Sequence, residues 1–370
     1  MVLQVLPALG GGGVERGTVE MAEAIARDGG TALVASAGGR MAPLVEQAGG
    51  RNIALPLDSK SPWRIWRNAA LLEEVIAREG VQILHARSRA PAWSAWLAAR
   101  RSGVHFITTY HGAYGEELPG KRGYNAVMAR GERVIAISHF IANLVIRRHG
   151  VDPGRIRIIH RGVDPAVFDP EAVAQERVQR LIDAWRLPPG RPVVMLPGRL
   201  TGWKGQRVLI AALANMKRRD AVGVLVGADQ GRHRYASDLS RLAASAGVDV
   251  RLVGDCGDMP AALTLADVVV NASVRPEAFG RVVIEAQAMG RPVIATDHGG
   301  AAETVAQGDT GWLVPPGDAD ALAAALDHVL AMTPDRAAAL GARARASVQA
   351  HYTVAAMQAA TLDVYREVLG

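Results

Sequence analysis

Short apolar runs alternate along the chain with segments whose apolar residues recur every three to four positions. In the first half, the runs predict strands at residues 2–6, 31–36, 83–84, 106–108, 133–137 and 156–159. A second series predicts strands at residues 192–196, 222–226, 250–253, 267–271 and 292–296. Strands separated by helical segments indicate βαβ units and parallel pairing. The pattern therefore predicts an α/β protein.

The length allows two domains with separate cores. A chain of 370 residues with 49% hydrophobic residues and 40 glycines suits an α/β protein with many tight turns. A stretch rich in Pro and Asp at residues 163–170 is the expected linker. We therefore expect domains at residues 1–166 and 167–350, followed by a last helix over residues 351–370.

The cysteine content and the hydropathy of the chain indicate the cellular compartment in which we expect the protein. The single cysteine, Cys256, excludes an internal disulfide and suits a reducing environment. The N-terminus lacks the pattern of a signal peptide, and no run reaches the roughly 18–20 apolar residues that span a bilayer. We expect a cytoplasmic protein, soluble or peripheral at the inner face of the membrane.

Two carboxylates, with seven residues between them, stand after an expected strand. Glu277 precedes Phe279-Gly280-Arg281, and Glu285 lies in the apolar segment that follows. A helix that begins near Gly280 would direct free N–H groups towards an anion such as a diphosphate, while the carboxylates accept from ligand hydroxyls. Alternatively, the acidic residues only complement the helix dipole.

Two further glycine-rich loops follow expected strands. Arg199 and Lys204 lie between Gly198 and Gly205, and two cations on one flexible loop suit a pyrophosphate; otherwise they are solvated surface charges. Gly12 and Gly13 open a helix after the first strand, where close backbone approach to a phosphate or sugar is possible. Both loops would lie at the carboxyl edge of a sheet, where such folds bind ligands.

Seven motifs in order resemble those of glycosyltransferase family 4, whose retaining enzymes have the GT-B architecture. They cover nearly the whole chain: Gly12-Gly13-Val14-Glu15, Thr109-Tyr110-His111-Gly112, Arg161-Gly162-Val163-Asp164, Gly198-Arg199-Leu200 with Lys204-Gly205, Glu277 to Glu285, Gly299-Gly300 with Glu303, and Gly311-Trp312-Leu313-Val314. The resemblance implies two Rossmann-like domains whose parallel sheets face a central cleft. It also implies that the last helix returns to the first domain.

The resemblance assigns roles to these positions. Arg199 and Lys204 would stabilise the leaving diphosphate, helped by N–H groups near Phe279, Gly280 and Arg281, with Gly12, Gly13 and Gly198 also at the donor site. Glu285 would bind the ribose and Glu277 the donor sugar, which His111 would face from the first domain. The implied reaction moves a hexosyl group from a nucleotide-diphosphate sugar, UDP before GDP, by same-face displacement.

We expect no metal and no separate cofactor. The Asp318-Ala319-Asp320 segment precedes an apolar helical pattern, so we interpret it as a helix cap rather than as a metal site. The basic residues of the glycine-rich loop can take the place of Mg²⁺ at the diphosphate.

Positive charge is concentrated in the first 166 residues, which carry 21 Lys and Arg against 14 Asp and Glu; the remainder carries 21 against 22. Since the family's first domain receives the acceptor, we expect an anionic cell-envelope glycan or lipid-linked acceptor, such as lipopolysaccharide core, or contact with an anionic membrane. Arg87 and Arg89 are candidates for gripping it. One-sided charge without a recognition motif argues against nucleic acid.

Tryptophans stand beside arginines in two segments, residues 61–67 and 85–101. This mixture is typical of membrane interfaces. Trp93 and Trp96, spaced like one helix face, are better interpreted as core. Two other functions stay open: a sugar-nucleotide epimerase on the same scaffold, and a non-catalytic nucleotide-sugar sensor.

Overall fold

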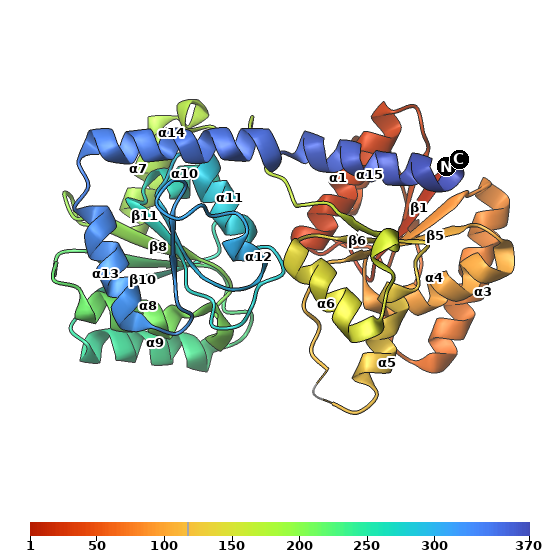
Figure 1. Ribbon diagram of the computed structural model, residues 1–370, viewed down its shortest axis with the longest axis horizontal. Coiled ribbons are helices and arrows are strands. Elements are labelled where there is room, and N and C mark those ends of the chain that lie inside the picture. Colours follow the sequence, from red (N-terminus) through yellow and green to blue (C-terminus); the bar gives the residue numbers. More distant parts are fainter. Residues whose placement is uncertain (117) are drawn as a thin grey trace. The chain divides into compact units, whose positions relative to one another are not determined.

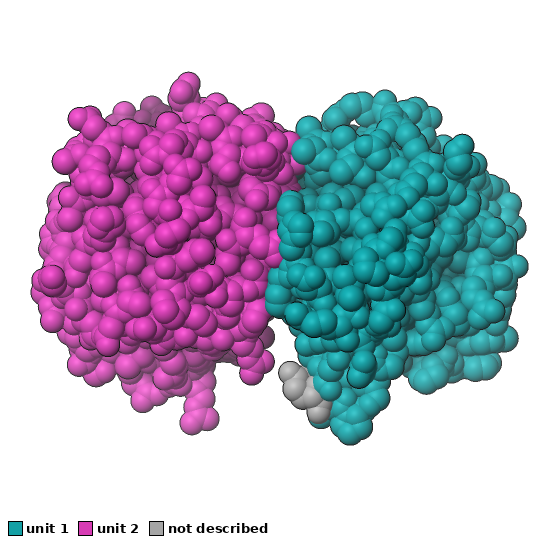
Figure 2. Space-filling view, viewed as in Figure 1, with its two compact units in different colours: residues 1–160, 354–370 teal, residues 161–353 magenta. Residues whose placement is uncertain are grey.

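The structure, a computed structural model, describes residues 1–116 and 118–370, which form two compact units (Figure 2). Unit 1 comprises Met1–His160 and Val354–Gly370, and unit 2 comprises Arg161–Thr353. Each unit has its own sheet, its own flanking helices and its own core (Figure 1).

The sheet of unit 1 has seven strands in the order β3-β2-β1-β4-β5-β6-β7. All its pairings are parallel. The strands are β1 (Val2–Val5), β2 (Ala32–Ser36), β3 (Arg51–Ala54), β4 (Ile83–Ala86), β5 (His105–Tyr110), β6 (Arg133–Ala136) and β7 (Ile156–Ile158). The strand order reverses between β1 and β4, so the connections that follow these two neighbouring strands lead to opposite halves of the sheet.

Helices follow the strands of unit 1 and cover its sheet (Figure 1). They are α1 (Gly13–Arg27), α2 (Ala42–Gln47), α3 (Pro62–Glu79), α4 (Arg89–Ser102), α5 (Lys121–Asn125) and α6 (His139–His149), with α15 (Val354–Leu369) added from the end of the chain. Short 3₁₀ turns lie at Ala126–Ala129 and Pro153–Arg155. Ser138 caps α6 by accepting from Ile141 N at 3.1 Å.

The sheet of unit 2 has six strands in the order β10-β9-β8-β11-β12-β13, again all parallel. They are β8 (Val193–Pro197), β9 (Val222–Val226), β10 (Asp249–Gly254), β11 (Val268–Asn271), β12 (Val293–Thr296) and β13 (Trp312–Val314). The order reverses between β8 and β11. The predicted α/β fold with two parallel sheets is therefore confirmed.

The helices of unit 2 are α7 (Gln175–Trp185), α8 (Gln206–Asn215), α9 (His233–Ser245), α10 (Met259–Thr264), α11 (Arg281–Ala288), α12 (Gly299–Ala302), α13 (Ala319–Leu330) and α14 (Pro334–His351). Short 3₁₀ turns lie at Pro170–Ala172 and Gly202–Lys204. Asp318 accepts from Ala321 N at 2.9 Å and so caps α13, as the helix-cap interpretation expected.

Burial explains which strands the sequence pattern reveals. Central strands such as β8 and β9 are buried throughout because helices cover both faces, and their sequences are nearly continuous apolar runs. The edge strand β3 is only partly buried and mixes polar with apolar residues, and β13 is a run of only three apolar residues. The pattern of apolar runs therefore misses both of them.

The last helix, α15, packs beside α1 in unit 1 (Figure 1). Its Gln358 side chain donates to Glu20 O at 2.7 Å, and Tyr365 Oη lies 2.7 Å from His85 Nδ1 in the buried interior. His85 Nε2 lies 2.7 Å from Thr109 Oγ1. These contacts fix α15 to α1 and, through His85, to β4 and β5 in the middle of the unit 1 sheet.

Candidate functional site

The reversal of strand order in unit 2 brings two loops together. β8 is followed by the loop with Gly198 and Lys204, and β11 is followed by the loop with Glu277. Because β8 and β11 are neighbours whose connections lead to opposite sides of the sheet, their carboxyl ends form a crevice of the kind that binds ligands in doubly wound folds. The structure thus brings together the two loops that the sequence singled out.

Glycine at position 205 allows the two loops to meet. Gly205 has a φ of +76°, and a Cβ built there would lie 1.8 Å from Ala272 O, at the end of β11. Only glycine permits both this backbone conformation and this approach. Across the same contact, Val274 N donates to Trp203 O at 2.8 Å. The β8 loop therefore lies directly against the β11 loop, with Lys204 at the junction.

Lys204 and Glu277 form an ion pair at this junction. The Lys204 Nζ atom lies 2.7 Å from Glu277 Oε1, and the two side chains are 15% and 11% exposed. Ser273 Oγ also donates to Oε1. Both donors bond the same oxygen, Oε1.

The charge of Glu277 is maintained against its burial. Burial alone would raise the pKa of Glu277, but the Lys204 ammonium and its hydrogen bond, together with the Ser273 hydroxyl, lower the pKa below its ordinary value. The carboxylate is thus ionised at neutral pH. An ionised acceptor suits the hydroxyl groups of a sugar.

The backbone around Glu277 is fixed from β12 and α12. Gly300 N donates to Glu277 O at 2.8 Å, and a Cβ on Gly299 would lie 2.6 Å from the same oxygen. His298 Nε2 lies 2.7 Å from Ser273 O. The Gly299-Gly300 motif therefore positions the Glu277 loop.

The second carboxylate of the motif, Glu285, lies on α11. Its Oε1 atom is 3.4 Å from Arg281 Nη2, one turn earlier, and the side chains are 14% and 20% exposed. The helix starts after Gly280, whose φ of +76° and close approach to Ala301 exclude a side chain. Phe279 is 3% exposed and packs on Tyr352 at a ring distance of 6.0 Å. Its side chain is thus part of the core, and only its backbone is available at the helix N-terminus.

Arg199 is exposed on the β8 loop. Its guanidinium has no hydrogen-bond or ion-pair partner among residues 1–116 and 118–370. Its backbone is fixed, because the buried Gln206 side chain donates to Arg199 O at 3.0 Å. Tyr235 in turn donates to Gln206 at 3.2 Å. Arg199 is therefore a cation on a rigid loop, open to an anion.

Within the described part of the chain, three buried donors near the β8 and β11 loops have no protein partner. They are Thr201 Oγ1, Asn271 Nδ2 and Arg281 Nε. Thr201 and Asn271 are 8% and 4% exposed, so solvent reaches them poorly. Buried polar groups in native proteins are normally hydrogen-bonded. Unsatisfied donors beside cationic side chains suit a bound anion, whose oxygens would accept hydrogen bonds from these donors.

In unit 1, the reversal of strand order lies between β1 and β4. Gly12 and Gly13 form the start of α1 after β1, and a Cβ on Gly12 would lie 2.7 Å from Glu15 Oε2. Glycine there keeps the helix N-terminus open at the carboxyl edge of the sheet. His111 follows β5 at the same edge and is half-buried.

The structure places the two arginines after β4 differently. Arg87 is 2% exposed, its Nη1 atom donates to Gln4 Oε1 at 3.0 Å, and burial lowers the pKa of its guanidinium. Arg89 is half-buried, lies 4.0 Å over the Tyr114 ring and donates to Asn125 at 2.9 Å. Arg87 thus contributes positive potential from the interior, while Arg89 lies nearer the surface.

Sequence reasoning missed several residues that shape these sites. Ser273 and Gln206 act within their own loops, on Glu277 and Arg199, whereas His85 contacts the distant Tyr365. Ser273 lies just after β11, and this position was the only indication of its role in the sequence.

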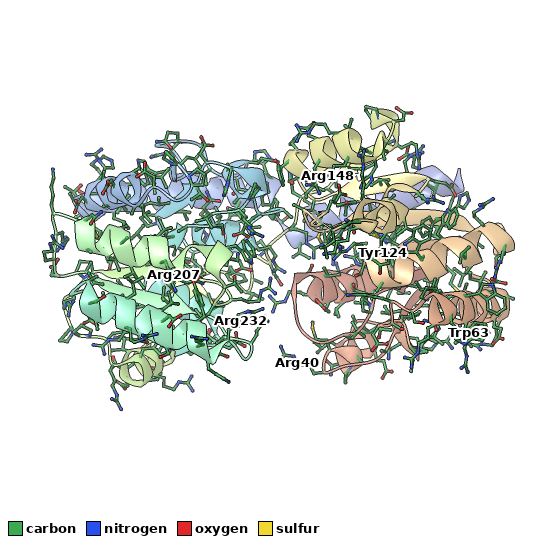
Figure 3. All side chains as sticks on the ribbon, turned by 90° about the horizontal axis from the view of Figure 1, so that it is seen from below. Arg40, Trp63, Tyr124, Arg148, Arg207 and Arg232 are labelled. Carbon is green, nitrogen blue, oxygen red and sulfur yellow. The ribbon has the colours of Figure 1, made fainter. Side chains whose placement is uncertain are left out.

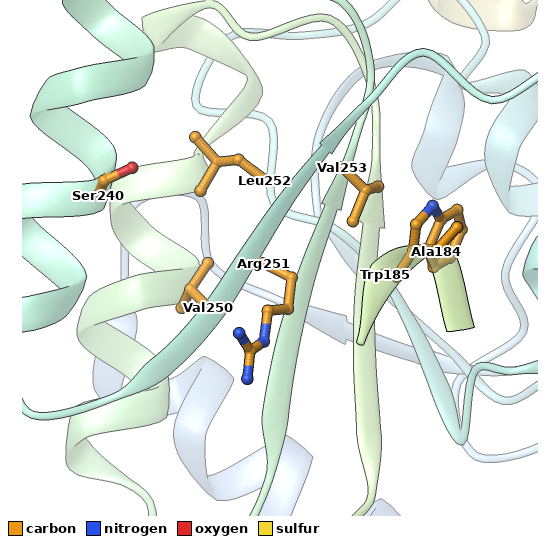
Figure 4. A pocket seen from close by; sticks show the side chains of 7 residues that line it. All are labelled: Ala184, Trp185, Ser240, Val250, Arg251, Leu252 and Val253. Carbon is orange, nitrogen blue, oxygen red and sulfur yellow. The ribbon is translucent and has the colours of Figure 1, made fainter. Parts of the chain in front are cut away.

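A pocket of about 380 Å³ at edge strand β10, lined by Trp185 and Arg251 among others, lies apart from the β8 and β11 loops (Figure 4). No helix among the described residues is long and apolar enough to cross a membrane.

The fold and the β8–β11 crevice define a GT-B glycosyltransferase. The model of Glycosyltransferase Family 4 matches residues 11–167, and that of Glycosyl transferases group 1 matches residues 178–347. The chain belongs to glycosyltransferase family 4.

Similar proteins agree with this assignment. A crystal structure of a glycosyltransferase from Rickettsia africae ESF-5 is 35% identical with a TM-score of 0.92, covering 100% of this chain and 98% of that one. A D-inositol 3-phosphate glycosyltransferase 2 of Catenulispora acidiphila is 35% identical over 73% of this chain and 67% of its own length. A GDP-mannose-dependent alpha-(1-6)-phosphatidylinositol monomannoside mannosyltransferase of Mycolicibacterium smegmatis is 31% identical over 76% and 82%. The chain spans between 58% and 67% of the D-inositol 3-phosphate glycosyltransferases that it matches.

Proposed function

We propose that the β8–β11 crevice binds a nucleotide-diphosphate sugar and that the enzyme transfers its hexosyl group with retention of configuration. The observation that carries this proposal is the Lys204–Glu277 pair at the switch point, with Arg199 open beside it. The pair offers an ammonium to a diphosphate and an ionised carboxylate to a sugar. A crevice that binds both halves of such a donor needs both groups.

In the proposed reaction, the anomeric C–O bond to the diphosphate breaks while the acceptor oxygen bonds to the same face of the sugar. Negative charge grows on the leaving phosphate, where Arg199, Lys204 and the N–H groups at the start of α11 stabilise it. The leaving phosphate takes the proton of the acceptor hydroxyl. Because the acceptor attacks the face that the diphosphate leaves, the configuration is retained without a carboxylate nucleophile. Glu277 binds the sugar in this proposal.

The remaining residues orient the two substrates. Glu285 accepts from the ribose hydroxyls, with Arg281 keeping its carboxylate in place. His111 and the Gly12-Gly13 turn, at the carboxyl edge of the unit 1 sheet, also take part in substrate binding in this proposal. The cations of the β8 loop take the role that a metal has in other transferases, and transfer proceeds without one.

The acceptor is proposed to be anionic and linked to a lipid or to a cell-envelope glycan such as lipopolysaccharide core. The excess of positive charge in residues 1–166 supports this choice, and Arg89 is the surface arginine best placed to bind a phosphate, with Arg87 behind it. Two of the similar proteins are named for inositol 3-phosphate and for a phosphatidylinositol mannoside. We favour UDP over GDP as the donor nucleotide, although one relative is named for GDP-mannose.

Nucleotide binding tests the proposal before any acceptor is known. Thermal shift and calorimetry with UDP, GDP, ADP and dTDP in EDTA should single out one nucleotide, since a ligand at 100-fold its Kd adds about 2.7 kcal/mol of stability. Glu285→Ala should abolish this shift. Glu171→Ala, which removes a carboxylate that is 87% exposed in the same unit, is the matched control and should retain it. Absence of binding by all four nucleotides would contradict the proposal.

A further inference from the structure

The first turn of α3 presents two tryptophans to solvent. Trp63 and Trp66 are 69% and 52% exposed, and their rings stack at 5.8 Å with 20° between the planes. Figure 3 shows Trp63 on the outside of unit 1. Tryptophan is normally buried to a large extent, so a stacked exposed pair marks an interaction surface.

The core does not need these two rings. The inner face of α3 is occupied by Ala69, Leu72 and neighbouring buried residues, and Asn68 donates to Pro56 O at 2.7 Å. Trp63 and Trp66, three positions apart, lie on the opposite face. The helix is therefore packed without them, and their apolar surface is left for a partner outside the chain.

Positive charge surrounds the pair. Lys60, Arg64 and Arg67 are exposed, and none of them has an ion-pair partner within the described part of the chain. The first turn of α3 contains no acidic residue. Farther along the helix, by contrast, Glu73 pairs with Arg101 at 2.9 Å. The cations beside the tryptophans are thus uncompensated.

The other tryptophan-rich segment differs in this respect. Trp93 and Trp96 are half-buried, Trp93 Nε1 donates to Tyr124 O at 3.0 Å, and the Arg130 guanidinium lies 4.2 Å over the Trp96 ring. These contacts occupy both rings within unit 1. The structure therefore separates two segments that look alike in sequence, and only the first turn of α3 is open.

The open turn lies at the functional edge of unit 1. Since α3 follows β3 and α4 follows β4, both helices start at the carboxyl edge of the parallel sheet, and Ser94 Oγ of α4 donates to Ile65 O of α3 at 2.9 Å. The loops after β1, β4 and β5 leave the sheet at this same edge. A partner bound at the first turn of α3 is thus near the loops proposed to receive the acceptor.

We propose that Lys60, Trp63, Arg64, Trp66 and Arg67 form an aromatic–basic surface that docks unit 1 on an anionic lipid bilayer. Indole rings prefer the headgroup region, and each nearby cation gains from anionic lipid. A sugar-binding platform would combine the rings with carboxylate or amide acceptors, whereas this turn offers cations. This docking would bring the enzyme to a lipid-linked acceptor and so adds to the proposed function. It rests on the proposed function only for the statement that the acceptor is lipid-linked.

Sedimentation with lipid vesicles tests the surface. The wild-type protein should bind phosphatidylcholine vesicles containing about 30 mol% phosphatidylglycerol, release with added salt and ignore pure phosphatidylcholine. The pair Arg64→Gln and Arg67→Gln should weaken binding about 30-fold. The matched control, Arg219→Gln with Arg336→Gln, removes the same charge from exposed positions of unit 2 and should stay within about twofold of wild type.

Replacing the rings tests their insertion. Trp63→Ala with Trp66→Ala should weaken vesicle binding at least about tenfold and abolish the blue shift of tryptophan fluorescence on binding. Wild-type binding by this variant, or no binding of the wild type at low salt, would overturn the proposal. Self-association of the wild type that the variant loses, without vesicle binding, would instead assign the surface to a second copy.

Nucleotide binding separates this inference from the proposed function. All the docking variants should keep the nucleotide-induced thermal shift of the wild type, because none lies in the β8–β11 crevice. Loss of vesicle binding with an intact shift isolates the docking surface. A wild type that binds vesicles but no nucleotide would contradict the transferase proposal and leave the docking surface standing.

Discussion

Replacing Lys204 by alanine should change how the stability of the protein depends on pH. The Lys204–Glu277 pair is nearly buried, with 15% and 11% of the side chains exposed. Removing one member of a buried pair costs about 3–5 kcal/mol. Because the Ser273 hydroxyl still bonds Glu277, we expect Lys204→Ala to lower the free energy of unfolding by about 2–4 kcal/mol at neutral pH.

The sign of the pH effect follows from the pKa of Glu277. In the wild type this pKa is lowered from 4.5, so the stabilising contribution is complete above pH 4.5 and is lost as pH falls through the folded-state pKa. Without Lys204, burial dominates and raises the pKa of Glu277 above 4.5. The folded variant then takes up a proton more readily than its unfolded chain, and it regains stability as pH falls.

Urea denaturation of both proteins between about pH 8 and pH 4.5 measures this difference. The gap in unfolding free energy should be widest near pH 8 and narrow steadily towards pH 4.5. Adding Glu277→Gln to Lys204→Ala removes the uncompensated charge, so the double variant should recover about 1–2 kcal/mol at neutral pH and lose the narrowing. A gap that is constant with pH would refute the assignment of a coupled, buried pair.

Two other substitutions test the framework of the units. Gly205→Ala should lower the free energy of unfolding by at least about 2 kcal/mol in urea denaturation and weaken nucleotide binding, because its Cβ meets Ala272 O; Gly202→Ala, which meets nothing within 4 Å, should be near wild type. Tyr365→Phe should cost about 1–3 kcal/mol of thermal stability, because Nδ1 of the buried His85 loses its partner, and an unchanged melting temperature would argue against that contact.

The sequence predicts the central strands well because strands that are buried on both faces consist of nearly continuous apolar residues. Strand β9, Val222–Val226, lies where the pattern places it. Strand β3 escapes prediction because it meets solvent and mixes polar with apolar residues, and β13 escapes because it is a run of only three apolar residues. The last helix expected over residues 351–370 is α15, which begins at Val354, and the preceding helix α14 ends at His351.

The site is predictable to a lesser extent. Spacing within one loop identifies Lys204 and Glu277 as candidates, but their ion pair depends on the approach of two loops 73 positions apart. Burial also changes how a residue acts, which spacing cannot reveal. Arg87 follows a strand as a surface arginine would, yet its side chain lies inside unit 1 beside Gln4.

Exposure is the property that separates the two tryptophan–arginine segments. Trp93 and Trp96 have helical spacing, and so do Trp63 and Trp66, so periodicity alone treats them alike. In the structure, the first pair packs within unit 1 and the second does not. The difference comes from Tyr124 and Arg130, which are distant in sequence from α4 and cover its rings.

The central claim is that the β8–β11 crevice activates a nucleotide sugar for transfer without a metal. Release of the nucleoside diphosphate from its sugar conjugate, followed in EDTA with water as the acceptor, tests this claim without knowledge of the natural acceptor. We expect slow release by the wild type, freed sugar of retained configuration by NMR, and at least about a 10²-fold loss in Lys204→Ala. Release by Lys204→Ala within about threefold of wild type, or freed sugar of inverted configuration, would contradict the account.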